Sequence, residues 1–405
     1  MERFTGIIGV IVLLGIAFLM SNNRKKIDYK LVLWGLVLQL GFALFILKTP
    51  IGLPFFEFFD VMIKQLLAFS DQGGDFLFAA FSSGRVEAPL INFAVRVLPT
   101  IIFFSALIAV LYHLGVMQFI VKWIAKGVQK TMGTSGSETL SVVGSIFVGQ
   151  TEAPLLVRPY IKGMTKSEIM TIMVGGFATV AGGVMAIYVA MLSDIEGIAG
   201  HLMAASIMSA PAAIVVAKII YPETEISETK GSLSVNVEKT ADNAMEALGD
   251  GAIDGLKLAA NIGAMLIAFV AMVAMIDYLL SFVHTSLAEV FGFIFRPLAW
   301  CMGAPWEESG ILGTLLGEKI VLTELIAYKD LSQIRAAGEL SDRTAIIASY
   351  ALCGFANFAS IGIQMGGIGG IAPSRKKDIS KIALKAMIGG AIASWITASI
   401  AGILI

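Results

Sequence analysis

Charged residues are scarce in this chain of 405 residues, where they make up 15% of the sequence against about 25% in soluble domains. Hydrophobic residues make up 57%, and the mean hydropathy is +0.83. This composition excludes a soluble fold and predicts an integral membrane protein that lies in lipid. The formal net charge of −1 gives no support for a nucleic-acid partner, which a basic surface would favour.

Cysteine and histidine are scarce as well. Cys301 and Cys353 lie in separate apolar stretches, which favours two free buried thiols over a disulfide. The three histidines, His113, His201 and His284, are far apart in the sequence and predict no metal cluster.

Catalytic signatures are also missing. The chain has no Gly-x-Ser-x-Gly elbow, no His-Glu-x-x-His helix and no paired cysteine and histidine, so an intramembrane enzyme such as a hydrolase is disfavoured. We therefore expect a protein that is not an enzyme and that uses no organic cofactor.

Apolar runs predict an all-α integral membrane protein with about eight transmembrane helices. The expected spans are residues 4–20, 30–48, 93–115, 167–192, 198–220, 257–283, 342–370 and 380–404. Basic residues cluster in the links at 24–30, 122–130 and 375–381, whereas the link at 193–196 has none. The positive-inside rule places the basic links in the cytoplasm and both termini outside.

Three further segments lie between the spans. Residues 116–133 carry a stripe of lysines beside apolar residues, and residues 284–303 are rich in aromatic residues. Both are expected to lie at the membrane interface. Residues 221–243 are acidic and polar and are expected to form a solvent loop.

A polar stretch interrupts the apolar sequence at residues 149–154, which read GQTEAP. It separates two apolar runs, 140–148 and 155–161, each shorter than the roughly 20 residues that a span needs. Irregular backbone survives at membrane depth only where it is buried in protein or lines a wet cavity. The pattern predicts a re-entrant hairpin. Thr151 is expected to cap its second half-helix, with Glu152 in the first turn, where the helix dipole favours a negative charge.

A carboxylate at each of two such tips is interpreted as functional. A charge at the bilayer centre costs roughly 2.5–3.5 kcal/mol on insertion scales, and a glutamine in place of Glu152 would cap a helix nearly as well. Thr323 and Glu324 repeat the Thr-Glu pattern at a second tip. Glu318 and Lys319, just upstream, are candidates to pair with each other, so Glu324 needs a partner from the fold or from a substrate.

The two hairpins belong to an internal repeat. Each is followed by a span with a polar or glycine-rich interruption, at 175–183 in the first unit and at 353–360 in the second. The first hairpin is expected to enter from the cytoplasm and the second from outside, so the units have inverted topology. This arrangement is typical of secondary transporters, whose site lies at the midplane between broken helices.

The polar residues near the tips define the candidate substrate chemistry. Asn357 and Ser360 are three positions apart, on one helix face or around a break. With Gln150, Thr151 and the two carboxylates they would repel an anion and suit a neutral solute with vicinal hydroxyls. Phe355 could pack on a ring, although an isolated phenylalanine is more often part of the core.

A second candidate site would hold a small monovalent cation. The hydroxyls of Ser145 and Thr179 lie near the carbonyls of Val148 and Val180 in the sequence. Serine and threonine in membrane helices usually bond to the preceding turn, which is the alternative interpretation of these two hydroxyls.

These residues resemble the concentrative nucleoside transporter family over roughly residues 90–404. The motifs that carry the resemblance are residues 137–142, 149–160, 175–183, 324–328 and 350–358. The resemblance implies a cation-coupled symporter that imports nucleosides such as uridine across a bacterial-type inner membrane by an elevator-type mechanism.

The resemblance also implies roles for individual residues. Those facing the nucleobase, directly or through water, would be Gln150, Thr151 and Glu152. Those holding the ribose would be Glu324, Asn357 and Ser360, with Phe355 beside the site. The coupling ion would be Na⁺, held by the side chains of Ser145 and Thr179 and the carbonyls of Val148 and Val180.

The family architecture is a homotrimer in lipid, with a static scaffold and a moving transport domain that holds both hairpins. Applied to this chain, it divides the sequence into scaffold spans at 1–115, a first repeat at 116–220, a loop and scaffold span at 221–283, and a second, inverted repeat at 284–405.

Two positions depart from the family pattern. The usual sodium-site asparagine is Ser145, whose hydroxyl has a shorter reach and a weaker dipole than an amide carbonyl. Proton coupling through Glu152 or Glu324 is therefore the alternative to sodium coupling. The usual Asn-Glu-Phe of the second tip is Thr323-Glu324-Leu325, which keeps the carboxylate and changes its neighbours.

Two further alternatives stay open from the sequence. One is a carrier for another neutral polar solute, such as a free nucleobase or a sugar. The other is a passive channel lined by the half-helices.

Overall fold

The computed structural model describes residues 2–50, 52–82, 98–230 and 241–405. Regular structure in these ranges is helical, apart from one isolated bridge between Ser135 and Lys230, which confirms the predicted all-α class. The helices before the first hairpin are α1 (Glu2–Leu19), η1 (Arg24–Lys26), α2 (Tyr29–Lys48), α3 (Gly52–Ser82), α5 (Leu98–His113) and α6 (Val116–Met132).

The remaining helices fall in the two segments that were predicted to be repeats and in the stretch between them. The first contains α7 (Gly136–Gly144), η3 (Ala153–Val157), α8 (Arg158–Ile161), α9 (Lys166–Ala178), α10 (Gly182–Met191) and α11 (Ile198–Ile220). After α12 (Ala244–Ser281) and α13 (Leu287–Cys301), the second contains α14 (Ser309–Val321), α15 (Glu324–Ala336), α16 (Asp342–Leu352), α17 (Phe358–Ile371), η4 (Pro373–Arg375) and α18 (Lys376–Leu404). We call residues 136–161 hairpin 1 and residues 309–336 hairpin 2.

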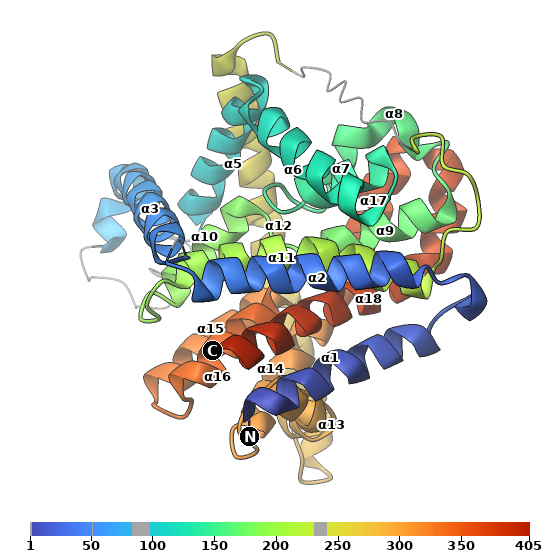
Figure 1. The fold of residues 1–405 in the computed structure, drawn as a ribbon. Coiled ribbons are helices and arrows are strands. Elements are labelled where there is room, and N and C mark those ends of the chain that lie inside the picture. Colours follow the sequence, from blue (N-terminus) through green and yellow to red (C-terminus); the bar gives the residue numbers. More distant parts are fainter. Residues whose placement is uncertain (1, 51, 83–97, 231–240) are drawn as a thin grey trace.

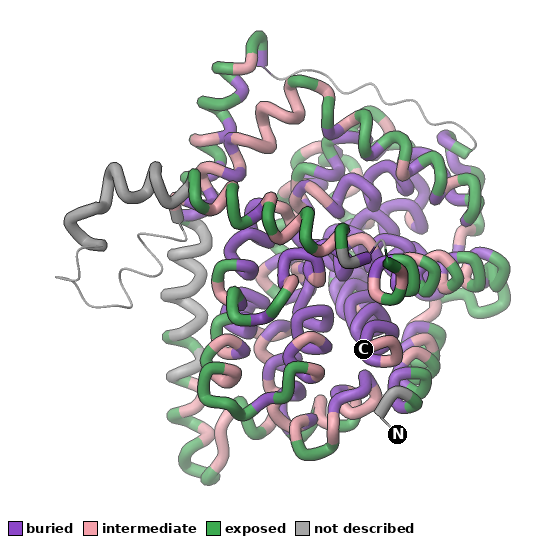
Figure 2. The backbone as a smooth tube through the Cα atoms, turned by 60° about the vertical axis from the view of Figure 1, so that its left-hand side comes forward, coloured by how far each residue is buried: buried purple, intermediate pink, exposed green. Residues whose placement is uncertain are grey.

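The centre of the molecule is built on α11 and α18, which pack on each other and on α9. Buried residues concentrate there, and exposed residues lie on the outer helices (Figure 2). The first two helices cover this centre, α1 along α18 and α2 along α11 (Figure 1). Glycines permit the close approach, because a Cβ on Gly35 of α2 would lie 2.1 Å from Val215 of α11.

A second packed pair is formed by α5 and α12, which lie along each other, and α5 also contacts α10 and α3. Gly251 and Gly255 of α12 have the small-xxx-small spacing that lets membrane helices approach closely. A Cβ on Gly255 would lie 2.7 Å from the Cα of Ile102. The predicted scaffold segment 1–115 is therefore divided in its packing, since α1 and α2 join α11 and α18 whereas α5 joins α12.

Several boundaries differ from the expected spans. No span was expected over Gly52–Ser82, which forms α3, and α12 begins at Ala244 rather than near residue 257. The early start of α12 has a local cause, because the Asn243 side chain accepts hydrogen bonds from the backbone N–H groups of Met245 and Glu246. Such an N-cap can start a helix in polar sequence that hydropathy does not detect.

By length and composition, four described helices could cross a membrane. They are Tyr29–Lys48, Lys166–Met191, Ile198–Ile220 and Pro373–Leu404. A fifth candidate is the pair of α5 and α6, which bends by 75° where the interfacial segment was expected to begin. The larger number of eight spans stays a prediction.

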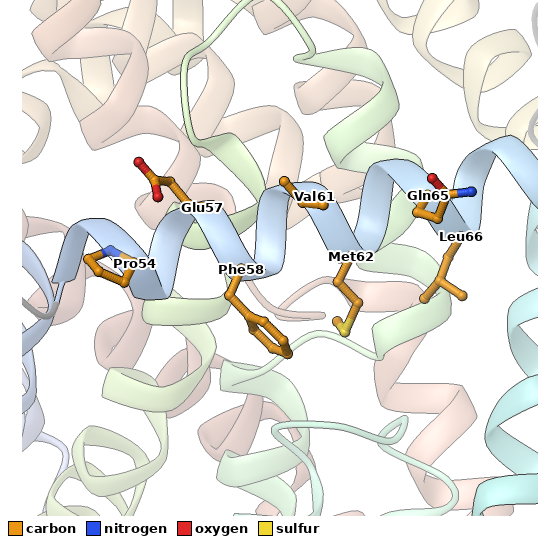
Figure 3. A pocket seen from close by; sticks show the side chains of 7 residues that line it. All are labelled: Pro54, Glu57, Phe58, Val61, Met62, Gln65 and Leu66. Atoms are coloured by element: carbon orange, nitrogen blue, oxygen red, sulfur yellow. The ribbon is translucent and has the colours of Figure 1, made fainter.

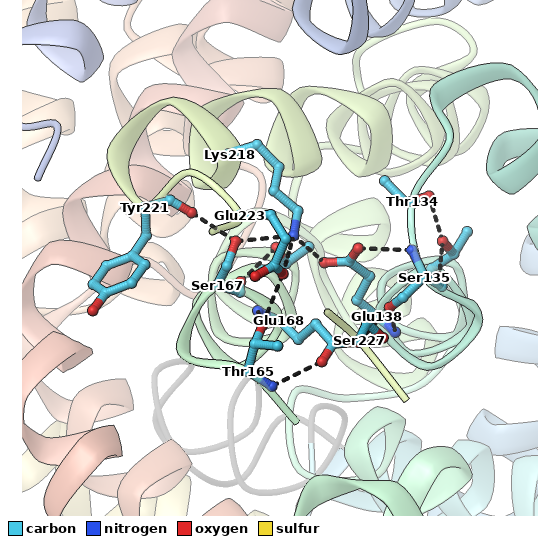
Figure 4. A network of polar contacts seen from close by, with 12 residues as sticks. Thr134, Ser135, Glu138, Thr165, Ser167, Glu168, Lys218, Tyr221, Glu223 and Ser227 are labelled. Atoms are coloured by element: carbon cyan, nitrogen blue, oxygen red, sulfur yellow. Dashed lines mark hydrogen bonds and ion pairs between the residues drawn. The ribbon is translucent and has the colours of Figure 1, made fainter. Parts of the chain in front are cut away.

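A buried polar network fixes the base of hairpin 1 (Figure 4). Ser135 and Glu138 form a capping box at the start of α7, and Thr165 and Glu168 form another at the start of α9. The ammonium of Lys218 on α11 lies 2.8 Å from a carboxylate oxygen of Glu138. An ion pair thus joins the start of α7 to the end of α11, and a hydrogen bond from the Lys218 ammonium to the Ser167 hydroxyl at 2.9 Å joins the start of α9 to it.

The expected solvent loop takes part in this network. The Ser227 hydroxyl donates to Glu168 Oε1 at 2.6 Å, and the backbone N–H of Gly136 donates to the Thr229 carbonyl at 3.0 Å. Ser227 and Thr229 are buried. The expectation of a solvent-exposed loop is therefore wrong for this part of it, because serine and threonine hydroxyls satisfy a buried carboxylate. Residues 231–240 of the loop lie outside the described residues.

Candidate functional site

The tip of hairpin 1 is a turn at residues 145–152 rather than the start of a regular helix. The second arm begins with the short 3₁₀ segment η3, whose N-cap position is occupied by Glu152 without a side-chain cap. The Thr151 hydroxyl donates instead to Glu152 Oε1 at 2.9 Å. The predicted Thr151 cap is therefore wrong. The Glu152 carboxylate lies directly over Gly149, where a Cβ would be 2.1 Å from its Oε2 atom.

The tip of hairpin 2 follows the prediction. Thr323 is the N-cap of α15 and accepts a hydrogen bond from the backbone N–H of Ile326 at 3.4 Å, and Glu324 is in the first turn. The Glu324 carboxylate is buried and accepts hydrogen bonds from the Tyr188 hydroxyl at 2.9 Å and from Asn357 Nδ2 at 2.8 Å. The partner that Glu324 requires thus comes from two polar groups of the fold.

Asn357 and Ser360 lie around the break between α16 and α17. Asn357 is the N-cap of α17, and its Oδ1 accepts from the backbone N–H of Ser360 at 2.8 Å. The Ser360 hydroxyl in turn accepts from Gln150 Nε2 at 3.1 Å. A continuous series of hydrogen-bonded residues therefore joins the two hairpin tips in the order Gln150, Ser360, Asn357 and Glu324, with the backbone N–H of Ser360 making the link to Asn357.

Within this series the predicted residues differ in exposure. Gln150, Glu324, Asn357 and Ser360 are buried, Thr151 and Phe355 are half-buried, and Glu152 is exposed. Thr151 faces α17, because a Cβ on Gly367 would lie 3.1 Å from its methyl group.

Sequence reasoning missed Tyr188, which supports Glu324. Tyr188 lies on α10 and its ring stacks on Tyr328 of α15, with the ring centroids 4.2 Å apart. The Tyr328 hydroxyl donates to the Ser349 carbonyl at 2.7 Å. Both rings are fully buried. The available signal was Tyr188 itself, a tyrosine inside the apolar segment of α10, since a buried tyrosine hydroxyl needs a polar partner.

Lys319 does not pair with Glu318. Its ammonium is fully buried and donates to the carbonyls of Ala351 and Cys353, each at 2.9 Å. These carbonyls lie at the C-terminal end of α16, where helix carbonyls lack intrahelical partners and a positive charge is favourable. The Glu318 Oε2 atom has no hydrogen-bond partner in the described part of the chain. The suggested Glu318–Lys319 pair is therefore wrong.

The candidate cation ligands lie on both sides of one junction. The Phe147 carbonyl of hairpin 1 accepts from the backbone N–H of Gly182 at 3.1 Å, which holds the turn against the start of α10. The hydroxyls of Ser145 and Thr179 donate to the carbonyls of Val142 and Gly175, at 2.7 and 3.0 Å. Each hydroxyl thus bonds to the preceding turn.

Those bonds use only the hydroxyl protons, so the oxygen lone pairs stay available for a cation. The carbonyls of Val148 and Val180 belong to residues outside the helices. The donor set of two hydroxyls and two carbonyls therefore has the oxygen chemistry that hard cations prefer.

The two broken helices meet at their breaks. Gly354, in the break between α16 and α17, has φ +99°. A Cβ there would lie 2.6 Å from the Phe177 carbonyl oxygen and 2.7 Å from the carbonyl carbon of Ala178, at the end of α9. Only glycine combines this backbone conformation with this approach.

Gly354→Ala is expected to reduce the solute uptake that the sequence predicts at least tenfold and to lower thermal stability. A positive φ costs a non-glycine residue about 1 kcal/mol or more, and the methyl group would push the two breaks apart. Uptake and unfolding temperature measure the two effects. Gly338→Ala is the control, since Gly338 has φ +75° but nothing within 4 Å of its Cβ position. Equal effects of both substitutions would contradict the expectation that close packing between the two helix breaks requires glycine at position 354.

An open groove on α3 is distinct from these residues (Figure 3). Its lining consists of Pro54, Glu57, Phe58, Val61, Met62, Gln65 and Leu66. All seven lie on one helix at the edge of the molecule (Figure 1). Because all seven lie on α3, outside both hairpins and both broken helices, we assign the groove no part in substrate binding.

Two hairpins and two broken helices that meet around buried polar side chains are the architecture of a secondary transporter. Comparison with protein families agrees. The profile "Na+ dependent nucleoside transporter N-terminus" matches residues 8–81, "Nucleoside recognition" matches 94–194, and "Na+ dependent nucleoside transporter C-terminus" matches 201–402.

Similar proteins occur in bacteria and mammals. The chain is 43% identical to an uncharacterized transporter of Haemophilus influenzae, covering 100% of the chain and 98% of the relative. It is 40% identical to human sodium/nucleoside cotransporter 1, covering 100% of the chain but 64% of that longer protein. The chain therefore belongs to the Na⁺-dependent, concentrative nucleoside transporter family, whose members are transporters rather than enzymes.

Solved structures of CNTnw have the same fold. The inward-facing, substrate-bound state superposes with a TM-score of 0.92 at 40% identity, covering 100% of this chain and 98% of that one. An outward-facing state of a substituted form has a TM-score of 0.91, covering 100% and 99%. The chain is thus a multi-pass membrane protein with the fold of these transporters.

Proposed function

We propose that this protein is a cation-coupled symporter that concentrates nucleosides such as uridine. The observation that carries the proposal is the buried series from Gln150 to Glu324, which joins both hairpin tips. It offers a carboxylate at one end and a neutral amide at the other. This polarity suits a solute with vicinal hydroxyls at one end and a neutral polar ring at the other.

In this proposal the ribose binds at hairpin 2 and the base at hairpin 1. The carboxylate of Glu324 has about four lone-pair sites, of which Tyr188 and Asn357 use two. Two remain for vicinal hydroxyls, with Ser360 beside them. Gln150, Thr151 and Glu152 would face the base, and half-buried Phe355 would lie next to the bound solute.

Sodium is proposed as the co-transported ion, with the oxygens of Ser145, Val148, Thr179 and Val180 as its ligands. Support comes from the "Na+ dependent" family profile and from the junction between Phe147 and Gly182, which brings the two halves of the ligand set together. Proton coupling through Glu152 or Glu324 is the second candidate, because Ser145 provides a hydroxyl where the family usually has an amide.

For the whole assembly we propose a homotrimer in the inner membrane, with both termini outside the cytoplasm. The packing supports an elevator in which the α5–α12 pair is static and both hairpins move with α11 and α18. In this division α1 and α2 travel with the moving part, because they pack on α18 and α11.

Proteoliposomes with imposed gradients test the coupling. Uridine is expected to accumulate above its outside concentration under an inward sodium gradient and to equilibrate once an ionophore collapses that gradient. A potential of 100 mV contributes about 2.3 kcal/mol for each charge moved inward, which supports a roughly 50-fold concentration ratio.

The other outcomes identify the alternatives. Accumulation under a proton gradient alone would replace sodium with protons. Equilibration without accumulation under either gradient would favour a passive channel. Competition by free uracil or free ribose as strong as that by uridine would favour a carrier for another neutral solute.

A further inference from the structure

Gln364, on α17, is a fully buried side chain that the proposed site does not yet use. Its Nε2 donates two hydrogen bonds, to the Met173 carbonyl of α9 and to Gln150 Oε1, both at 3.1 Å. Gln364 therefore connects a main-chain group of the helix core with the tip of hairpin 1.

Space for this contact is provided by Gly176 of α9. A Cβ at Gly176 would lie 2.7 Å from Gln364 Nε2 and 3.0 Å from the Cβ of Gln150. The two glutamine side chains are therefore packed directly on the α9 backbone, where their freedom to rotate is small.

The Met173 carbonyl determines which way the Gln364 amide points. A carbonyl oxygen only accepts hydrogen bonds, so it must face the NH₂ group of Gln364 and not its oxygen. This orientation is kept although Gln364 Oε1 is buried without a hydrogen-bond partner among the described residues.

The orientation is passed on to Gln150. Because Gln364 presents N–H to Gln150, Gln150 must turn its Oε1 toward Gln364 and its Nε2 toward Ser360. One N–H of Gln150 bonds to Ser360 Oγ at 3.1 Å. In the described part of the chain its second N–H has no acceptor, so it is available to a ligand.

We propose that Gln364 is a positioning residue that fixes hairpin 1 as a hydrogen-bond donor toward the base. The site would then select nucleosides whose base offers an acceptor, a carbonyl oxygen or an unprotonated ring nitrogen, to Gln150 Nε2. This inference rests on the proposed nucleoside function and adds a determinant of base selectivity.

Gln364→Met tests the proposal because it keeps the length of the side chain and removes both hydrogen bonds. The measurement is inhibition of labelled uridine uptake by uridine and by two uridine analogues, one lacking the 2-carbonyl oxygen and one lacking the 4-carbonyl oxygen. The wild-type protein is expected to prefer uridine over at least one analogue by about tenfold, the effect of one hydrogen bond. In Gln364→Met that preference is expected to fall to about twofold or less.

Gln39→Met is the matched control. Gln39 of α2 is also fully buried, and its Nε2 donates to the Thr397 hydroxyl at 2.8 Å, remote from the tips in sequence and contacts. Loss of this hydrogen bond in Gln39→Met is expected to change stability without changing the preference for uridine over its analogues in the inhibition measurement.

Gln364→Glu is the second variant. A carboxylate cannot donate to Gln150, which would have to turn its Nε2 toward residue 364 and its Oε1 toward the ligand. The preference should then shift from uridine toward a nucleoside with a 4-amino group, such as cytidine, if the 4-position is the one recognised, and otherwise fall as in Gln364→Met.

The outcomes separate this inference from the proposed function. Absence of nucleoside uptake by the wild-type protein would overturn the function itself. Active Gln364 variants with an unchanged uridine-to-analogue ratio would overturn only the positioning role. Failure of both Gln364 variants to fold, with Gln39→Met folded, would also overturn it, because Gln364 would then be structural.

Discussion

Glu324→Gln is expected to reduce uridine uptake at least about 100-fold while the protein still folds and inserts. The carboxylate would lose its charge and half of its acceptor sites, because an amide has one oxygen and a carboxylate has two. Each charge-assisted hydrogen bond contributes about 1.5–3 kcal/mol, so two bonds to ribose hydroxyls correspond to a roughly 10²–10⁴-fold effect.

Folding of Glu324→Gln is expected to survive because the remaining oxygen can still accept from Tyr188. Uptake per amount of inserted protein is the measurement, with the unfolding temperature in detergent as the check on folding. Glu318→Gln is the matched control, an identical change on α14 in a half-buried carboxyl that we place outside the site. Normal uridine uptake by Glu324→Gln would remove hairpin 2 from the ribose site.

Lys319→Met is expected to have the second largest effect, with uptake below about a tenth of wild type and a clearly lower unfolding temperature. The substitution leaves the buried carbonyls of Ala351 and Cys353 without their donor. Leaving a buried polar group unsatisfied costs about 1–3 kcal/mol, so the two together cost roughly 2–6 kcal/mol before relaxation.

A matched control for Lys319→Met is Lys329→Met. Lys329 is on α15 of the same hairpin, is exposed, and lies near Asp330 in a surface ion pair, which contributes little to stability. If Lys319→Met matched Lys329→Met in both uptake and unfolding temperature, the result would contradict a role of the Lys319 ammonium in stabilising the C-terminal end of α16.

Prediction from sequence succeeded where the pattern is local. The second tip shows this, since Thr323 caps α15 and Glu324 lies in its first turn. The break at residues 353–357 also shows it, because glycine and asparagine mark a helix end and a helix start. Both signals lie within a few residues of the structure that they specify.

Prediction failed where a partner is distant in sequence. Lys319 finds its acceptors more than 30 positions away, and Gln364 finds Gln150 more than 200 positions away. The neighbours of Lys319 in the sequence suggested Glu318 instead. The prediction of a Thr151 cap at the tip of hairpin 1 failed for another reason. The second arm of this hairpin starts as a 3₁₀ segment whose N-cap residue makes no side-chain cap bond.

The region around α3 shows a third kind of failure. Residues 52–82 combine aromatic and apolar residues with several charges and two adjacent glycines. This composition lowers the hydropathy of any window of span length, although the segment forms a helix. A prediction of helices from length and hydropathy alone therefore misses amphipathic helices such as α3.

The series of hydrogen bonds from Gln150 to Glu324 has a consequence for how tightly a solute is held. Several of its polar groups satisfy one another, while the second N–H of Gln150 and two lone-pair sites of Glu324 stay open. A nucleoside that also bonds to Ser360 or Asn357 would therefore replace some bonds that the protein makes by itself. Binding then becomes partly an exchange of partners, and its net free energy is smaller than the sum of the new contacts. A carrier benefits from this, because the same exchange in reverse lets the solute leave on the other side of the membrane without a large barrier.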